Sequence, residues 1–375
     1  MRAVFVTNFC PHYRVGAFEE LARRMLVNFY FFSESEPYWE KRNPTGGGKF
    51  AHVQLSGFPL LPRVRVSPGL IWHLLRDDYA IVIKCTNGRF ALPVSYLIAK
   101  LRRKKFILWQ TIWYHPATFF HRLSYPLQKH IWMHADAIVV YGEHGKRFLE
   151  SEGVSSGKIR IAWQAVDNSS FNRSVTDSEQ SELRQRLGLQ QKKIILYVGQ
   201  LIPVKGLPFL IEALRLIERQ DVTLLIVGRG PLEEGLKHQY GNAGNVLFLG
   251  YLPPHELPVL YAAASALVLP SVSLPHVKEA WGLVVNEAMN QGCPAVVTDA
   301  VGAGVGGLVH NGKNGFVVPE RNAEALAAAI NKILSDNELA SRMREEAART
   351  IKEWTFERWA AGFVEAVQYA TRNPR

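Results

Sequence analysis

Two carboxylates flank a glycine in the second half of the chain, at a spacing that suits the binding of a ligand rich in hydroxyl groups. Glu279 and Glu287 stand eight positions apart in EAWGLVVNE, which continues into AMNQGCPAVVTD. The pattern predicts a loop that ends at Gly282, a helix over 283–291 and a buried strand over 294–298. Glu279 then lies in the loop ahead of the helix, and Glu287 lies about one turn inside it.

The start of that predicted helix suits a phosphate group. The first N–H groups of a helix have no intrahelical partner and the helix dipole is positive there, so an anion is stabilised. Gly282 lacks the side chain that would block its approach. The amides of Gly282, Leu283 and Val284 can hold a phosphate while the two carboxylates accept hydrogen bonds from sugar hydroxyls. This combination predicts a sugar nucleotide site; for this stretch alone, an ordinary strand, loop and helix is the alternative.

A lysine follows a second predicted strand. The apolar run 194–199 leads into QLIPVKG, which places Gln200 and Lys205 in the loop before the next helix. Ligands of open parallel sheets bind beyond the carboxyl ends of the strands, where an ammonium group can neutralise a phosphate. The alternative for Lys205 by itself is a surface lysine that closes a turn.

Two more loops follow predicted strands of the same half. Arg229 belongs to Gly-Arg-Gly-Pro after the strand 223–228, and this motif lacks the rest of a dinucleotide fingerprint, so it does not predict NAD. Tyr251 and Leu252 follow the strand 246–249, where backbone groups can meet a nucleotide base.

Length and composition indicate a globular protein of two domains. A single core rarely exceeds about 250–300 residues, and this chain has 375. With 47% hydrophobic and 21% charged residues, disorder is excluded. Cys10, Cys85 and Cys293 are far apart in sequence, so neither a disulfide framework nor a zinc site is indicated. We expect neither a signal peptide nor a membrane span, and therefore a cytoplasmic protein.

The basic charge is confined to the first half. The net charge is +11; residues 1–170 carry 23 basic and 12 acidic residues, whereas residues 171–375 carry 21 of each. The run 100–105 (KLRRKK) and nearby aromatic residues suit an anionic membrane surface or an acidic polysaccharide. Nucleic acid is not expected, since no recognition motif accompanies the charge. A merely solvated basic surface is the alternative.

Strands alternate with helices along both halves, which predicts the α/β class with two Rossmann-like, doubly wound domains. We expect an N-terminal domain over 1–170, a linker with a short helix over 171–191 and a second domain over 192–355. The C-terminal helix 356–375 is expected to pack back on the first domain. The segment 33–67, rich in glycine and proline, is expected to be irregular.

The order of the motifs resembles the retaining glycosyltransferases of family 4, which have the GT-B fold. The motifs are VGQLIPVKG, IVGRGPLEEGL, LGYLPPHEL, VLPSV with KEAWGLVVNEAMNQGCPAVVTDAVGA, and NGKNGFVVP. The likeness covers residues 194–319 closely and the first half mainly as a pattern.

The resemblance implies a role for each matching residue. Glu279 contacts the donor sugar, Glu287 binds ribose hydroxyls, Lys205 binds the diphosphate, and the backbone of Gly282 and Leu283 meets the distal phosphate. His115, in TIWYHP, is the best match for the histidine beside the reacting sugar. The resemblance also implies two domains facing across a cleft, no metal or other cofactor, and retention of the anomeric configuration.

Three departures from the family pattern lie at phosphate-binding positions or near the sugar. Gln200 stands where many members have arginine, so Arg229 or Arg14 is a candidate second cation. The first loop, NFCPHYRVG, has only Gly16 where the family often has two glycines, and His12 can fill that space or serve no function there. The approach to Glu279, SVSLPHVKE, is longer than usual.

The expected function is therefore the transfer of a hexose from a UDP- or GDP-linked sugar to a glycan or lipid-linked acceptor at the cytoplasmic membrane face. The N-terminal domain is expected to bind the acceptor. Two alternatives remain: a non-catalytic sugar-nucleotide-binding partner of another glycosyltransferase, which Gln200 favours, and a GT-B sugar-nucleotide epimerase.

Overall fold

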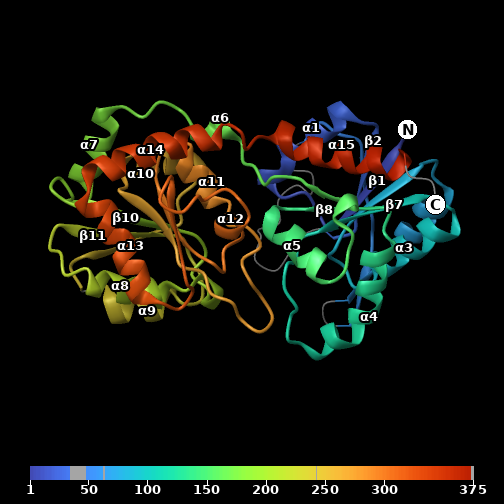
Figure 1. Ribbon diagram of the computed structural model, residues 1–375, viewed down its shortest axis with the longest axis horizontal. Helices are drawn as coiled ribbons and strands as arrows, with labels where there is room; N and C mark the ends of the chain where they lie inside the picture. The colour runs from blue at the N-terminus through green and yellow to red at the C-terminus, as the bar shows by residue number, and fades with distance from the viewer. Residues whose placement is uncertain (34–47, 62–63, 242, 373–375) are drawn as a thin grey trace. The chain divides into compact units, whose positions relative to one another are not determined.

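The chain folds into two compact α/β units. The structure, a computed structural model, describes residues 1–33, 48–61, 64–241 and 243–372. Unit 1 comprises Met1–Ala165 with Phe356–Arg375, and unit 2 comprises Val166–Thr355. In each unit a parallel sheet is covered by helices on both faces (Figure 1). The predicted α/β class and doubly wound architecture are confirmed.

Unit 1 is built on a seven-stranded sheet with the order β3-β2-β1-β6-β7-β8-β9, and all of its pairs are parallel. Its strands are β1 (Ala3–Thr7), β2 (Val27–Phe31), β3 (His52–Gln54), β6 (Ile81–Cys85), β7 (Lys105–Gln110), β8 (Ala137–Val140) and β9 (Ile159–Ile161). Its helices are α1 (Val15–Arg24), α2 (Pro68–Arg76), α3 (Ala91–Leu101), α4 (Phe119–His134), α5 (Glu143–Ser151) and α15 (Phe356–Arg372).

Alternate residues of the central strands fill the cores on the two faces of this sheet. On β1, Val4 and Val6 pack with side chains of α2, α3 and α4, whereas Phe5 packs with Phe18 of α1 and Phe363 of α15. Strands buried on both faces have this composition, because successive side chains point to opposite sides. The helix at the end of the chain thus supplies part of the core of unit 1.

Helices α1 and α15 lie side by side (Figure 1). Their contact explains Gly16, since a Cβ atom there would meet the Phe356 ring at 2.4 Å. Gly16 is therefore required for packing within unit 1, and its predicted part in ligand approach stays a prediction.

The segment expected to be irregular is partly ordered. Its described residues form β3, which extends the sheet edge beside β2, and an antiparallel pair, β4 (Phe58–Leu61) with β5 (Val64–Val66). The prediction was wrong there because strands of three or four residues leave little periodicity in the sequence. Residues 34–47, where the glycine run stands, lie outside the described residues.

Unit 2 has a six-stranded parallel sheet with the order β12-β11-β10-β13-β14-β15. Its strands are β10 (Lys193–Val198), β11 (Val222–Val227), β12 (Val246–Gly250), β13 (Ala266–Leu269), β14 (Ala295–Thr298) and β15 (Gly315–Val318). Its helices are α6 (Asn168–Phe171), α7 (Asp177–Arg186), α8 (Leu207–Leu216), α9 (Glu233–Tyr240), α10 (Leu257–Ala263), α11 (Val284–Met289), α12 (Gly302–Val305), α13 (Ala323–Ser335) and α14 (Asn337–Ile351).

The stretch 171–191 is folded within unit 2. It holds α7, which begins with a capping box between Thr176 and Glu179 and packs against α10. The short helix expected ahead of β10 is present as α7, and it has one buried residue, Leu183. Such a helix shows almost no apolar stripe in its sequence.

Candidate functional site

The residues singled out in unit 2 gather at one edge of its sheet. Because every strand pair is parallel, the loops after β10, β11, β12 and β13 leave from the same edge. The chain proceeds from β10 outward to β11 and β12, and then returns to place β13 on the other side of β10. Ligands of doubly wound sheets bind at such a reversal of strand order. In unit 2 the reversal lies between β10 and β13.

Lys205 and Glu279 meet at this reversal. The Lys205 ammonium lies 2.5 Å from Oε2 of Glu279, and both side chains are only 15% exposed. The hydroxyl of Ser271, just after β13, donates to the same oxygen at 3.3 Å. The site therefore combines one cation, one carboxylate and one hydroxyl in a sheltered position where electrostatic interactions are stronger than at an open surface.

The backbone around Gly206 brings these loops together. Lys205 ends a short 3-10 helix (Pro203–Lys205), and Gly206 follows with φ = +65°. A Cβ atom on Gly206 would lie 2.0 Å from the carbonyl oxygen of Pro270, so only glycine permits the close approach of the two loops. The amide of Val272 donates to the carbonyl oxygen of Val204 at 2.8 Å and ties the loops further.

Glu287 lies in α11, about one turn inside the helix as predicted. The Tyr261 hydroxyl of α10 donates to Oε2 of Glu287 at 2.7 Å. Burial of the carboxyl group raises the pKa of Glu287 to about 7, although the hydrogen bond from Tyr261 opposes that rise. Glu287 is therefore partly protonated near neutral pH and able to donate as well as accept a hydrogen bond.

The turn before α11 depends on Gly282. Its φ is +92°, and a Cβ atom there would meet Leu269 at 2.6 Å. The indole of Trp281 donates to Oδ1 of Asn286 at 2.8 Å, which fixes the turn against the helix. Helix α11 is shorter than predicted, since Gly292 at φ = +66° follows its last turn. Phosphate binding by the amides of Gly282, Leu283 and Val284 stays a prediction.

The loops after β10 and β11 are hydrogen bonded to each other. The amide of Leu201 donates to the carbonyl oxygen of Arg229 at 2.9 Å, and the Tyr197 hydroxyl donates to that of Gln200 at 2.8 Å. The side chains of Gln200 and Arg229 are exposed. A Cβ atom on Gly250 would lie 4.0 Å from Nε of Arg229, so Arg229 lies beside the loop that carries Tyr251 and Leu252.

His115 lies in unit 1, in the loop after β7. Its Nε2 is 2.9 Å from Oε1 of Glu152, and its Nδ1 is 3.3 Å from Nε2 of His121. Burial raises the pKa of Glu152, but hydrogen bonds from Tyr125 and His115 outweigh that effect and hold the pKa below its usual value. The structure thus gives His115 a carboxylate partner; its predicted place beside the reacting sugar stays a prediction.

The two residues predicted in the first loop of unit 1 differ in their exposure to solvent. His12 is exposed, whereas Arg14 is 6% exposed and hydrogen bonds to Oε1 of Gln164. Arg14 belongs to the wall of a pocket of about 260 Å³ at the carboxyl ends of β1, β6, β7 and β8. Sequence reasoning identified Arg14 but not the pocket, because Gln164 and the helix α15 come from distant parts of the chain.

Ser271 and Tyr261 were not singled out from the sequence. Ser271 stands just past a predicted strand, which is the position that drew attention to Lys205, so the same signal was available. Tyr261 is fully buried in a helix of unit 2. From the sequence, it cannot be told apart from an ordinary core residue.

Among the described residues, no cluster of three His, Cys, Asp or Glu side chains is arranged to hold a metal ion. Within the same residues, no helix has the length and apolar character needed to cross a membrane.

Part of the chain that contains this site is similar to a known protein family. Residues 179–350 match the model of the family described as glycosyl transferases group 1. The matched region lies within unit 2, which is therefore similar to this family. Lys205, Glu279 and Glu287 all fall inside the matched region.

Similar sequences carry related names. The chain is 32% identical over 245 residues to the alpha-D-kanosaminyltransferase of Streptomyces kanamyceticus, which covers 62% of this chain and 61% of that protein. It is 30% identical to a GDP-mannose-dependent phosphatidylinositol monomannoside mannosyltransferase of Mycolicibacterium smegmatis, over 64% of this chain and 61% of that protein. The matches therefore span less than two thirds of each relative.

Solved structures with the same fold cover nearly all of this chain. HepE of Anabaena in complex with UDP gives a TM-score of 0.76 at 19% identity, over 98% of this chain and 100% of that one. A glycosyltransferase from Rickettsia africae gives 0.76 at 18% identity, over 100% and 99%. These neighbours establish that the chain has the GT-B fold, as the motifs implied.

Proposed function

We propose that this chain is a retaining, metal-independent glycosyltransferase that moves a hexose from a UDP- or GDP-linked sugar to a glycan or lipid-linked acceptor. The observation that carries the proposal is the pair of Lys205 and Glu279 at the strand-order reversal of unit 2. The pair supplies a cation that can bind a diphosphate and a carboxylate that can bind sugar hydroxyls. One hydrogen bond joins the two groups.

The charges suit the cleavage of a glycosyl phosphate. The bond between the anomeric carbon and the phosphate oxygen breaks, negative charge develops on the leaving diphosphate, and positive charge develops on the sugar ring. A cation fixed beside the diphosphate stabilises the transition state where this charge develops. In this account Lys205 supplies that cation, aided by the amides around Gly282, and Arg229 supports it from the neighbouring loop.

Glu279 acts here by accepting hydrogen bonds. Before the donor binds, its carboxylate accepts from Lys205 and from Ser271. With the donor bound, the bonds from Ser271 and from the sugar hydroxyls lower its nucleophilicity. We therefore propose that the acceptor oxygen itself attacks the anomeric carbon on the face that the diphosphate leaves, and that its proton goes to a leaving phosphate oxygen. This route retains the anomeric configuration. The resemblance to the family supports binding of the ribose hydroxyls by Glu287 and a role for His115 in the reaction of the sugar.

The named relatives and neighbours support the donor class. Solved neighbours bind UDP and UDP-glucose, and one relative is named as dependent on GDP-mannose. Both donor types are sugar nucleotides, which supports the general class and leaves the base and sugar to experiment.

The acceptor is proposed to lie at an anionic membrane surface, and helix α4 of unit 1 supports this. Its sixteen residues include Arg122 and Lys129 and no acidic residue. Its exposed apolar side chains include Phe119, which is 83% exposed, and Leu123, which is 70% exposed. A helix with exposed apolar and basic side chains suits the interface of an anionic bilayer.

The test is release of free nucleoside diphosphate from UDP- and GDP-hexoses, with and without membrane glycolipid extracts as acceptor, with EDTA present. Acceptor-dependent release, with the new linkage keeping the donor's anomeric configuration by NMR, is the expected result. Conversion of the donor sugar without acceptor would instead make the chain an epimerase. Nucleotide binding without turnover on any acceptor would favour a non-catalytic partner.

A further inference from the structure

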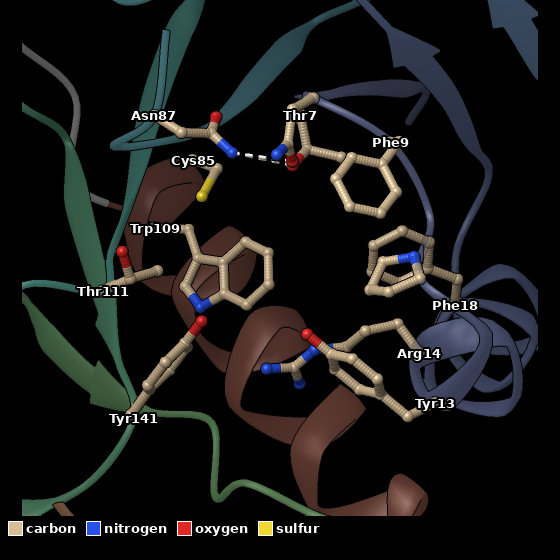
Figure 2. A pocket seen from close by; sticks show the side chains of 12 residues that line it. Thr7, Phe9, Tyr13, Arg14, Phe18, Cys85, Asn87, Trp109, Thr111 and Tyr141 are labelled. Atoms are coloured by element: carbon tan, nitrogen blue, oxygen red, sulfur yellow. Dashed lines mark hydrogen bonds between the residues drawn. The ribbon is translucent and has the colours of Figure 1, made fainter. Parts of the chain in front are cut away.

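A pocket in unit 1 contains an arginine whose positive charge has no counter-ion in the described chain. The pocket lies at the carboxyl ends of β1 and β6, where the strand order of unit 1 reverses, and holds about 260 Å³. Its lining contains one arginine, Arg14, and no acidic side chain; it consists of Thr7, Asn8, Phe9, Pro11, Tyr13, Arg14, Phe18, Cys85, Asn87, Trp109, Thr111 and Tyr141 (Figure 2).

Arg14 is held in a cage of aromatic rings. Its guanidinium carbon lies 5.3 Å from the ring centroid of Trp109, 5.5 Å from that of Tyr141 and 5.6 Å from that of Tyr13. Nη2 donates to Gln164, while Nη1 has no hydrogen-bond partner within the described residues. None of the described carboxylates forms an ion pair with Arg14. Buried charges in proteins are normally paired, because an unpaired charge costs several kcal/mol in a low-dielectric site.

A second donor of the same pocket also has no partner. The indole Nε1 of Trp109, a residue only 4% exposed, makes no hydrogen bond with the described residues. Figure 2 shows this nitrogen on the same side of the pocket as the Arg14 guanidinium, beside the Tyr141 hydroxyl. Unsatisfied buried donors are rare in native structures. Two of them, both N–H donors and one charged, together call for a ligand that accepts hydrogen bonds and carries negative charge.

A further cation precedes Cys85, a residue of the pocket lining, in the sequence. Lys84 is fully buried, and its ammonium donates to the carbonyl oxygens of Cys85 at 2.6 Å and Asn87 at 2.7 Å. Burial lowers the pKa of Lys84 to about 7. Lys84 is not among the residues that line the pocket, so Arg14 is the cation of the lining.

We propose that this pocket binds an anionic substituent of the acceptor, a carboxylate or a phosphate on a sugar-sized group, with Arg14 as its counter-cation and Trp109 as a second donor. That the bound molecule is the acceptor rests on the proposed function. The inference deepens that function by naming the chemical class of the acceptor. The pocket volume lies just below the range of about 300–1,000 Å³ for small-molecule sites, which suits one sugar unit and its charged group.

The test is ligand-observed NMR on the full chain with three probes at equal ionic strength: D-glucuronate, D-glucose 6-phosphate and D-glucose. At least one of the anionic probes is expected to bind tenfold or more tightly than glucose, since charge-assisted hydrogen bonds are the stronger class. The anionic probe that binds more tightly identifies the preferred group as carboxylate or phosphate. Equal binding of all three, or binding of none, would overturn the proposal.

Variants assign the binding to this pocket. Arg14→Gln and Trp109→Phe are each expected to weaken the anionic probe at least fivefold. Arg160→Gln is the matched control, because Arg160 lies in β9 of the same unit and donates to backbone carbonyls outside this pocket. Trp109→Phe keeps an aromatic ring in the cage, so it serves if Arg14→Gln does not fold. Unchanged affinity in a folded Trp109→Phe or Arg14→Gln protein would contradict the assignment.

UDP titrations on the same proteins separate this proposal from the proposed function. Parent protein that binds UDP but no anionic probe would contradict only the anion site. Parent protein that binds the anionic probe but no nucleoside diphosphate would contradict the proposed function and leave the anion site in place. Loss of UDP binding with intact probe binding in Arg14→Gln would assign Arg14 to the donor instead and overturn the proposal.

Discussion

The ammonium of Lys205 and the carboxylate of Glu279 neutralise each other at the point where the strand order of the unit 2 sheet reverses. A diphosphate that binds Lys205 therefore competes with Glu279 for the same cation. Donor binding is expected to shift the lysine toward the phosphate oxygens and to leave Glu279 free to accept bonds from the sugar. The pair thus prepares both groups for one ligand.

Glu279→Gln is expected to tighten the binding of UDP or GDP severalfold and to reduce transfer by a hundredfold or more. The first effect follows because the variant removes a negative charge beside the diphosphate site; the second follows from loss of the sugar contact and of one transition-state interaction. Calorimetric titration and initial rates measure the two effects. Glu233→Gln, which removes a carboxylate from an exposed lysine pair in α9, is the control and should change neither. Weaker nucleotide binding in Glu279→Gln would contradict this reading of the pair.

Glu287 is expected to make stability depend on pH. Burial raises the pKa of its carboxyl group from 4.5 to about 7, so the folded protein holds this proton more tightly than the unfolded chain. The resulting stabilisation is complete below about pH 4.5 and is lost as the pH rises through about 7, a change of about 3 kcal/mol as an upper bound.

Glu287→Gln should remove that dependence. Between pH 5 and pH 8 the urea midpoint of the parent should fall relative to that of the variant, while Glu234→Gln, on the exposed side of α9, should follow the parent. Parallel midpoints for parent and Glu287→Gln across this range would show that Glu287 keeps an ordinary pKa.

Two glycines with similar backbone angles allow a matched test of the loop at Lys205. Gly206 has φ = +65° and a Cβ atom there would meet Pro270, whereas Gly188 has φ = +67° and open space around it. Gly188→Ala should cost only the backbone strain, about 1 kcal/mol. Gly206→Ala should cost at least twice that and should also weaken UDP binding, because the loop that carries Lys205 must move. Equal losses of thermal stability in the two variants would contradict the close approach.

Membrane binding is expected to depend on α4 and much less on the basic run 100–105. Lys100 bonds to the carbonyl oxygen of His134, Arg102 bonds to those of Leu74 and Asp77, and Lys105 pairs with Asp136, so these side chains hold the fold of unit 1. The double variant Phe119→Ser with Leu123→Ser should release the protein from vesicles containing anionic lipid in a flotation assay. Leu216→Ser, at an exposed apolar residue of unit 2, is the control. Retention of the double variant on the vesicles would exclude α4 as the contact.

The gathering of the candidate residues of unit 2 at one sheet edge was predictable because they follow strands in order. A lysine after one strand and two glutamates around a glycine turn are local features, and parallel strands bring local features to one edge. The close pairing of Lys205 with Glu279 was not predictable, since it depends on the Gly206 and Pro270 contact between segments more than 60 residues apart.

The pocket of unit 1 shows where sequence reasoning stopped. Arg14 was recognised as a candidate cation, but its aromatic cage includes Trp109 and Tyr141 from other strands, and Gln164 lies 150 positions away. For the run 100–105, a dense local charge pattern does not reveal that Lys100 and Arg102 bond to backbone carbonyls, and its contact with a membrane stays a prediction. Long-range contacts, not residue types, decided both cases.

The measurement that tests the account most directly is calorimetric titration of the parent and of Lys205→Ala with UDP, GDP and ADP. One of the uridine or guanosine nucleotides should bind the parent, and Lys205→Ala should weaken that binding by roughly tenfold or more, because a charge-assisted bond to the diphosphate is lost. Lys237→Ala, at a lysine paired with Glu233 in the same unit, should bind as the parent does. Absence of binding by every nucleotide, or equal affinity in Lys205→Ala and the parent, would contradict a sugar nucleotide site at Lys205 and Glu279.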